Sequence, residues 1–114
     1  MTKKEERFEA YFEPADNIWV ELTASKNHET LKFGREVRVC AVTVSHENTD
    51  YVIVSLKKAE DTQPFYKHKF ESGLNGQIFI QPIPKTGVTE IEVKVEPKSG
   101  SSIEDSVLVN ISYI

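Results

Sequence analysis

The side chains that carry most enzyme chemistry are few in this sequence and stand far apart. None of the three histidines, His28, His46 and His68, lies two or four residues from another histidine or from a cysteine. Those spacings place two metal ligands on one face of a strand or a helix. His28 and His46 each precede a glutamate, and loops could bring the two pairs together, but solvated loop histidines are the simpler interpretation. We therefore predict no metal site and no cofactor.

Cys40 is the only cysteine of the 114-residue chain, which excludes an internal disulfide and a cysteine-rich zinc site. As a nucleophile it would need a base held beside it. It lies instead between Val39 and Ala41 in an apolar stretch, where a free cysteine behaves as a small hydrophobic residue. We predict that Cys40 packs in the core.

Glycine-rich motifs that bind phosphates or expose a nucleophilic serine are absent. The sequence contains no Gly-x-Gly-x-x-Gly, Gly-Lys-Ser/Thr or Gly-x-Ser-x-Gly string. Gly73 and Gly76 flank Leu-Asn, a composition typical of a hairpin turn. Because no acid, base and nucleophile stand at a recognisable spacing, the sequence predicts a protein that is not an enzyme.

One short stretch combines cations with aromatic rings and is a candidate binding site. Rings beside cations hold single-stranded nucleic acids or acidic peptides. The interpretation we favour is an edge strand whose lysines prevent unwanted pairing. The formal net charge of −4 argues against a nucleic-acid partner. The residues of this cluster are Phe65, Tyr66, Lys67, His68, Lys69 and Phe70.

Trp19 is the second candidate binding residue. The apolar residues around it alternate, so if they face the core, Trp19 faces outward. Its ring could stack on a sugar, with Tyr51 and Tyr66 as further platforms, or contact a protein partner. The interpretation we favour is that the aromatic residues 8–12 cover it.

Composition indicates which elements must position these side chains. Hydrophobic residues make up 39% and charged residues 28% of the chain, enough for one domain with its own core. Twelve valines and nine isoleucines stand against five leucines and five alanines, and β-branched residues favour strands. No apolar run approaches the roughly 18 residues of a membrane span, so we expect no membrane partner. No signal peptide begins the chain, so we expect a cytoplasmic protein or a fragment of a larger surface or particle protein.

Apolar alternation and turn signals predict seven short antiparallel strands. The pattern changes phase around Cys40, which indicates a bulge or a strand buried on both faces. Pro82 and Pro84 place their stretch at a strand end or a sheet edge, and the last strand is expected inside a sheet. Two packed sheets are the expected solution, and a small closed barrel is the alternative. The predicted strands are residues 17–23, 35–45, 52–56, 65–70, 76–83, 90–96 and 107–113.

The chain divides into an N-terminal aromatic segment, residues 1–16, and a β-sandwich domain, residues 17–114. Phe8, Tyr11 and Phe12 have the spacing of a short helix, whereas Phe8, Ala10 and Phe12 alternate as in a strand. Pro14 ends either element. This segment packs on the core or, alternatively, is a docking arm for another subunit.

Residues 33–44, the polar turn 47–50 and residues 51–56 together resemble the B strand, B–C turn and C strand of immunoglobulin-like and fibronectin type III-like sandwiches. Residues 76–83, 90–96 and 107–113 are similar to the last three strands of those domains. The antibody-type Cys–Trp–Cys pattern is absent, because Cys40 has no partner and Trp19 precedes it. The resemblance implies a seven-stranded antiparallel β-sandwich and an adhesion, spacer or interaction role.

Taken together, these features predict a non-catalytic protein-interaction or structural module. Its partner would be another protein or further copies of itself, held through the residue 65–70 edge and the N-terminal aromatic segment. The alternative is a carbohydrate-binding module that uses the aromatic platforms.

Overall fold

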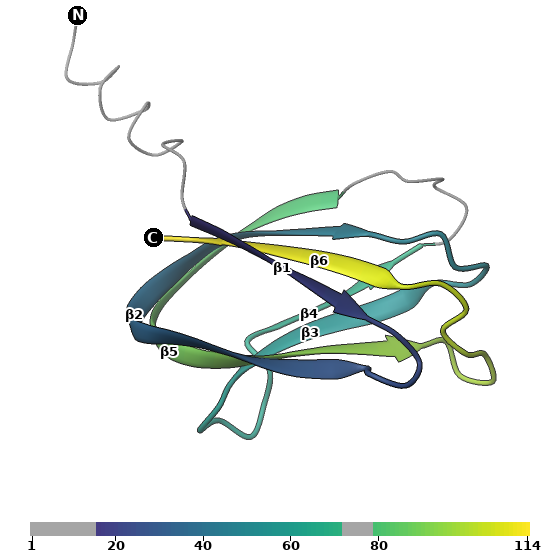
Figure 1. Cartoon of the computed structure of the whole chain (residues 1–114), viewed down its shortest axis with the longest axis horizontal. Coiled ribbons are helices and arrows are strands. Elements are labelled where there is room, and N and C mark those ends of the chain that lie inside the picture. Colours follow the sequence, from purple (N-terminus) through teal and green to yellow (C-terminus); the bar gives the residue numbers. More distant parts are fainter. Residues whose placement is uncertain (1–15, 72–78) are drawn as a thin grey trace, which may run out of the picture.

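The structure, a computed structural model, describes residues 16–71 and 79–114 and contains six strands in one sheet (Figure 1). No helix occurs in these two ranges. The all-β class predicted from the sequence is therefore confirmed. The strands are β1 (Asp16–Leu22), β2 (His28–Ser45), β3 (Val52–Lys58), β4 (Tyr66–Phe70), β5 (Phe79–Pro97) and β6 (Val107–Tyr113).

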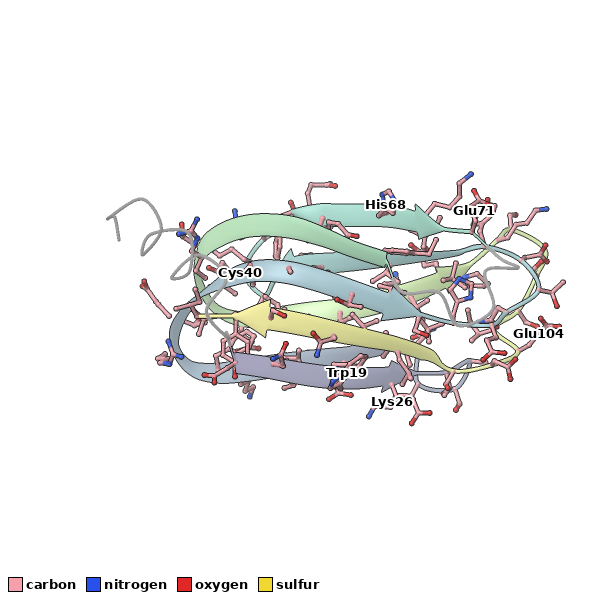
Figure 2. The ribbon with its side chains drawn as sticks, turned by 90° about the horizontal axis from the view of Figure 1, so that it is seen from above. Trp19, Lys26, Cys40, His68, Glu71 and Glu104 are labelled. Atoms are coloured by element: carbon pink, nitrogen blue, oxygen red, sulfur yellow. The ribbon has the colours of Figure 1, made fainter. Side chains whose placement is uncertain are left out.

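The sheet has the order β1-β6-β2-β5-β3-β4, and every neighbouring pair is antiparallel. Strands β2 and β5 are long enough to belong to two layers. The first layer contains β1, β6, residues 37–45 of β2 and residues 79–88 of β5. The second layer contains residues 28–32 of β2, residues 90–97 of β5, β3 and β4. Figures 1 and 2 show the sheet curled over in this way, which is the connectivity of a jelly roll.

The curl lets the branched aliphatic residues of both layers share one core. Val44 and Val109 from the first layer and Val54 and Val93 from the second are fully buried. Each alternates with outward residues, as a half-buried strand requires. Removing this apolar surface from water is the main favourable contribution to folding.

Two glycines lie where β2 and β5 bend from one layer into the other. Gly34 has a φ angle of 76° and Gly87 of 69°, values that residues with a Cβ atom rarely adopt. The pairing of β2 with β5 shifts register between Lys32 and Val37, beside both glycines. The shift and the positive φ angles together redirect the two strands.

The predicted bulge in β2 is confirmed, but the predicted burial of Cys40 is wrong. Val39 and Val42 are both fully buried, and the register shifts between Val39 and Ala41. The extra residue of the bulge belongs to neither buried set, so Cys40 is only half-buried. Its Sγ lies 3.6 Å from the carbonyl oxygen of Arg38.

The structure has six strands where the sequence predicts seven, and the immunoglobulin-like type is not confirmed. The predicted strands 76–83 and 90–96 are parts of the single strand β5, and β2 begins at His28, inside a stretch predicted as loop. Pro82 pairs with Ala41 in a part of β5 that has only β2 beside it among the described strands. Proline is tolerated at such an edge, so it did not end the strand. The predicted turn at 72–76 and the N-terminal segment fall on residues outside the described ranges.

The end of the sandwich is closed by His46, which is buried, contrary to the predicted solvated loop histidine. Its Nε2 donates to the carbonyl oxygen of Phe70, 3.1 Å away, at the end of β4. Its Nδ1 accepts a hydrogen bond of 3.2 Å from the backbone N–H of Asn48. The imidazole thus joins the end of β2 in the first layer to the end of β4 in the second.

Asn48 extends this connection to the loop between β5 and β6. Its Oδ1 accepts from the backbone N–H groups of Glu104 (2.6 Å) and Asp105 (2.9 Å). Its Nδ2 donates to the carbonyl oxygen of Asp105 at 3.0 Å. The Glu104 carboxylate accepts in turn from the backbone N–H of Thr49 at 3.0 Å, and this bond lowers the pKa of Glu104.

We expect Gly87→Ala to reduce the free energy of unfolding by about 1–2 kcal/mol, because alanine pays the cost of a left-handed backbone. No atom lies within 4 Å of the position that a Cβ would occupy, so the loss would come from the backbone alone. Gly87→Asn should lose less, because asparagine tolerates this conformation. Urea unfolding measures both variants, and equal stability of Gly87→Ala and the wild type would contradict the role of this bend.

We expect Asn48→Ala to reduce the free energy of unfolding by about 2–3 kcal/mol, because buried backbone groups lose their partners. Asn27→Ala is the control, since the Asn27 side chain is exposed and its Oδ1 lies 3.0 Å from the Nδ1 of the neighbouring His28. Thermal or urea unfolding separates the two. A loss at Asn48 no larger than at Asn27 would show that the loop cluster contributes little.

Candidate interaction surfaces

The outer face of the second layer carries alternating charges. The register places Lys32 opposite Glu90, and Glu92 opposite Lys57. Opposite charges on facing positions favour sheet pairing and keep a surface hydrated. This face has the composition of a solvent-exposed surface.

The outer face of the first layer, here called the β1–β6–β2 face, is almost uncharged. Trp19 is 56% exposed and Leu108 39% exposed, and these are two of the three exposed large hydrophobic residues found in the described ranges. Glu21 is the only charged residue among the nine positions that the register aligns on it. The three rows are Asn17–Ser112–Ala41, Trp19–Asn110–Thr43 and Glu21–Leu108–Ser45.

Polar groups on this face satisfy one another. The Ser112 hydroxyl is 2.7 Å from the Asn17 Oδ1 and 3.4 Å from the Asn110 Oδ1. Asn110 is buried although it lies at an outward position, beside Trp19 in the register. Contact with another surface would therefore leave few of these groups without partners.

The candidate cluster of residues 65–70 lies on β4, at the end of the strand order, which is the edge position that the sequence indicates. The sheet separates its two kinds of side chain. Tyr66 and Phe70 are buried, and Phe65 is half-buried, whereas Lys67 and Lys69 are exposed. The cations therefore do not sit above open rings of this strand.

His68 lies on the same side of β4 as Tyr66 and Phe70 but is exposed. Its ring centroid is 6.3 Å from that of Tyr66, nearly parallel, and 4.9 Å from that of Phe70, edge-on. Its register partner Val54 is fully buried. The inner side of β4 is thus exposed at His68, between the buried Tyr66 and Phe70.

The three candidate sugar platforms are not brought together. Trp19 lies on β1, at the opposite end of the strand order from Tyr66 on β4. Figure 2 shows Trp19 far from His68, which lies on the same strand as Tyr66. Tyr66 is buried, and the Lys69 Nζ lies 4.6 Å from the centroid of the Tyr51 ring. Trp19 alone offers a largely exposed ring. The predicted cover of Trp19 by residues 8–12 lies outside the described ranges.

In the described ranges, no group of three or more histidine, cysteine, aspartate or glutamate side chains could hold a metal ion. Nor is there, in those same residues, a helix of the length and hydropathy that would cross a membrane. Leu108, the second exposed large hydrophobic residue of the face that carries Trp19, was not predicted from the sequence. A signal was available, because Val107, Val109 and Ile111 alternate and leave Leu108 on the opposite side of the strand.

Burial raises the pKa of the Tyr66 phenol from 10 to about 12. Below pH 10 the phenol is neutral in both states, so its contribution to stability is complete there. Between pH 10 and about 12 it ionises only in the unfolded chain, so stability falls as the pH rises. We expect Tyr66→Phe to show a smaller loss of unfolding free energy over this interval. Parallel pH dependence of the two proteins in urea unfolding would contradict this assignment.

No protein family matches the sequence, and no curated protein is similar to it in sequence. Among solved structures, the fold is similar to the Drosophila NLP core, whose structure is described as giving insight into pentamer formation and histone binding. The identity is 13%, the TM-score is 0.55, and the match covers 87% of this chain and 98% of that one.

Two viral coat structures are more distantly similar. The Tobacco streak virus coat protein dimer shares 11% identity at a TM-score of 0.35 and covers 84% of each chain. A structure of infectious bursal disease virus shares 11% identity at a TM-score of 0.35, over 87% of this chain and 31% of that chain. The match to the Drosophila protein, at 13% identity, shows the fold alone.

Proposed function

We propose that the chain is a non-catalytic subunit that assembles with copies of itself through the β1–β6–β2 face. The observation that carries this proposal is the contrast between the two outer faces. One face has charges laddered along its register, whereas the other has one charged position of nine and exposes Trp19 and Leu108.

The chemistry of the β1–β6–β2 face suits a protein contact. Tryptophan is enriched at interfaces because it supplies a large apolar area from a rigid side chain. Ala41, Thr43 and Ser45 are small and let another backbone approach closely. Glu21 is the only charged residue whose hydration the contact would affect. It lies in an outer row on the edge strand, where the solvent-accessible rim of an interface is expected.

The comparison with the Drosophila NLP core supports self-association as the kind of contact, because that protein of similar fold is described as forming a pentamer. Histone binding is stated for that protein only. No residue of this chain is assigned to such a partner here. Because the two chains share only 13% identity, the contact surface proposed here rests on this chain's own exposed residues.

We expect the wild-type chain to associate in solution, and Trp19→Thr with Leu108→Thr to weaken that association at least about tenfold, which corresponds to about 1.4 kcal/mol. Sedimentation velocity over a concentration series measures the change. Ile53→Thr is the matched control, since Ile53 pairs with Glu96 and Lys69 on the second layer and should leave association unchanged. A wild-type chain that is monomeric at every concentration would overturn the proposal, and so would equal effects at both faces.

A further inference from the structure

The inner face of the sheet is partly exposed at the edge strand β4. An edge strand offers backbone N–H and C=O groups to a further strand. On the inner side of this edge, His68 is exposed, although Val54 opposite it is fully buried. An apolar side chain placed beside His68 would extend the core by one strand.

The other side of β4 is positively charged. Lys67 and Lys69 are both exposed on it. The Lys69 Nζ lies 4.6 Å from the centroid of the Tyr51 ring, which is half-buried, and 3.6 Å from the exposed Glu71 carboxylate. In a chain of net charge −4, this edge favours an acidic extended segment.

The chain itself contains such a segment ahead of β1. In residues 5–13, Phe8, Ala10 and Phe12 alternate with Glu9, Tyr11 and Glu13, and the stretch carries four glutamates against one arginine. An extended chain places alternate residues on opposite sides. One side would therefore be apolar, as the inner face at His68 requires, and the other acidic, as the two lysines require.

We infer that residues 5–13 of one copy add as a strand to β4 of a neighbouring copy. Backbone hydrogen bonds supply affinity in strand addition, and alternate side chains supply specificity. Phe8 and Phe12 would cover the exposed inner face on either side of His68. On the other side, one of Glu9 and Glu13 would face one of the two lysines, Lys67 and Lys69, directly, and the other glutamate would lie diagonally across from the second lysine, within reach of its long side chain. The inference rests on the self-association proposed above, but uses a second, separate surface.

The position of β1 favours a neighbouring copy over the same chain. Residues 23–27 join β1 directly to the first part of β2, which is at one edge of the second layer. Strand β4 is at the other edge of that layer, where the Phe65 ring lies 5.5 Å from the Lys85 Nζ of the first part of β5. Strand β1 and the outer side of β4 are therefore about four strand spacings apart, or roughly 19 Å. The three residue steps from Glu13 to Asp16 span only about 10 Å.

Charge reversal tests the inference on the full chain. Lys67→Glu/Lys69→Glu and Glu9→Lys/Glu13→Lys should each lower self-association at least about tenfold in sedimentation velocity. A mixture of the two variants should associate again, because the lysine arm of one then meets the glutamate edge of the other. Lys26→Glu/Lys98→Glu is the control, with the same change of charge at exposed positions away from β4.

The outcomes separate this inference from the proposed function. Association that survives both charge reversals but is lost in Trp19→Thr/Leu108→Thr would overturn the strand addition and leave the β1–β6–β2 contact standing. Loss in both reversals without recovery on mixing would also overturn it, and circular dichroism would confirm that each variant is folded. A monomeric wild-type chain would overturn both proposals together.

Discussion

One constraint shapes the whole molecule: a single sheet must cover its own apolar face. The inward residues of β2 and β5 are valines and isoleucines along most of their length. Residues 16–71 and 79–114 contain no helix that could cover them. The sheet therefore curls until its two halves face each other, and the aliphatic side chains of one half bury those of the other. The layers, their order and their two edges all follow from this closure.

Closure by curling needs places where long strands can turn. Gly34 and Gly87 adopt backbone angles that other residues avoid, and the register shifts of β2 lie beside them and at Cys40. At the far end, where none of the described strands crosses between the layers, His46 and Asn48 make the connection through hydrogen bonds to backbone groups. Backbone geometry fixes one end of the sandwich, and a buried polar cluster fixes the other.

Much of this architecture could be predicted from residue spacing. The period of two identified the inward residues of β1, β3 and β6, those of residues 37–44 of β2 and 91–95 of β5, the change of phase at Cys40 and the outward direction of Trp19. Spacing could not show that β5 continues through Pro82 and Pro84, because whether proline ends a strand depends on whether its missing N–H has a partner. It could not show the burial of His46 either, since the groups that bind it are 2 and 24 residues away.

The same closure explains why the two outer faces and the two edges differ in character. The two layers bury most of their inner faces against each other, so the fold places no demand on the outer residues. An outer face with laddered charges is what solubility alone requires. The β1–β6–β2 face departs from that composition with an exposed tryptophan in its middle row, and β4 departs from it with an exposed histidine on an inner position. Within the described residues, Trp19 and His68 are exposed, although His68 contacts the Tyr66 and Phe70 rings, and the contacts with another copy proposed above would cover both.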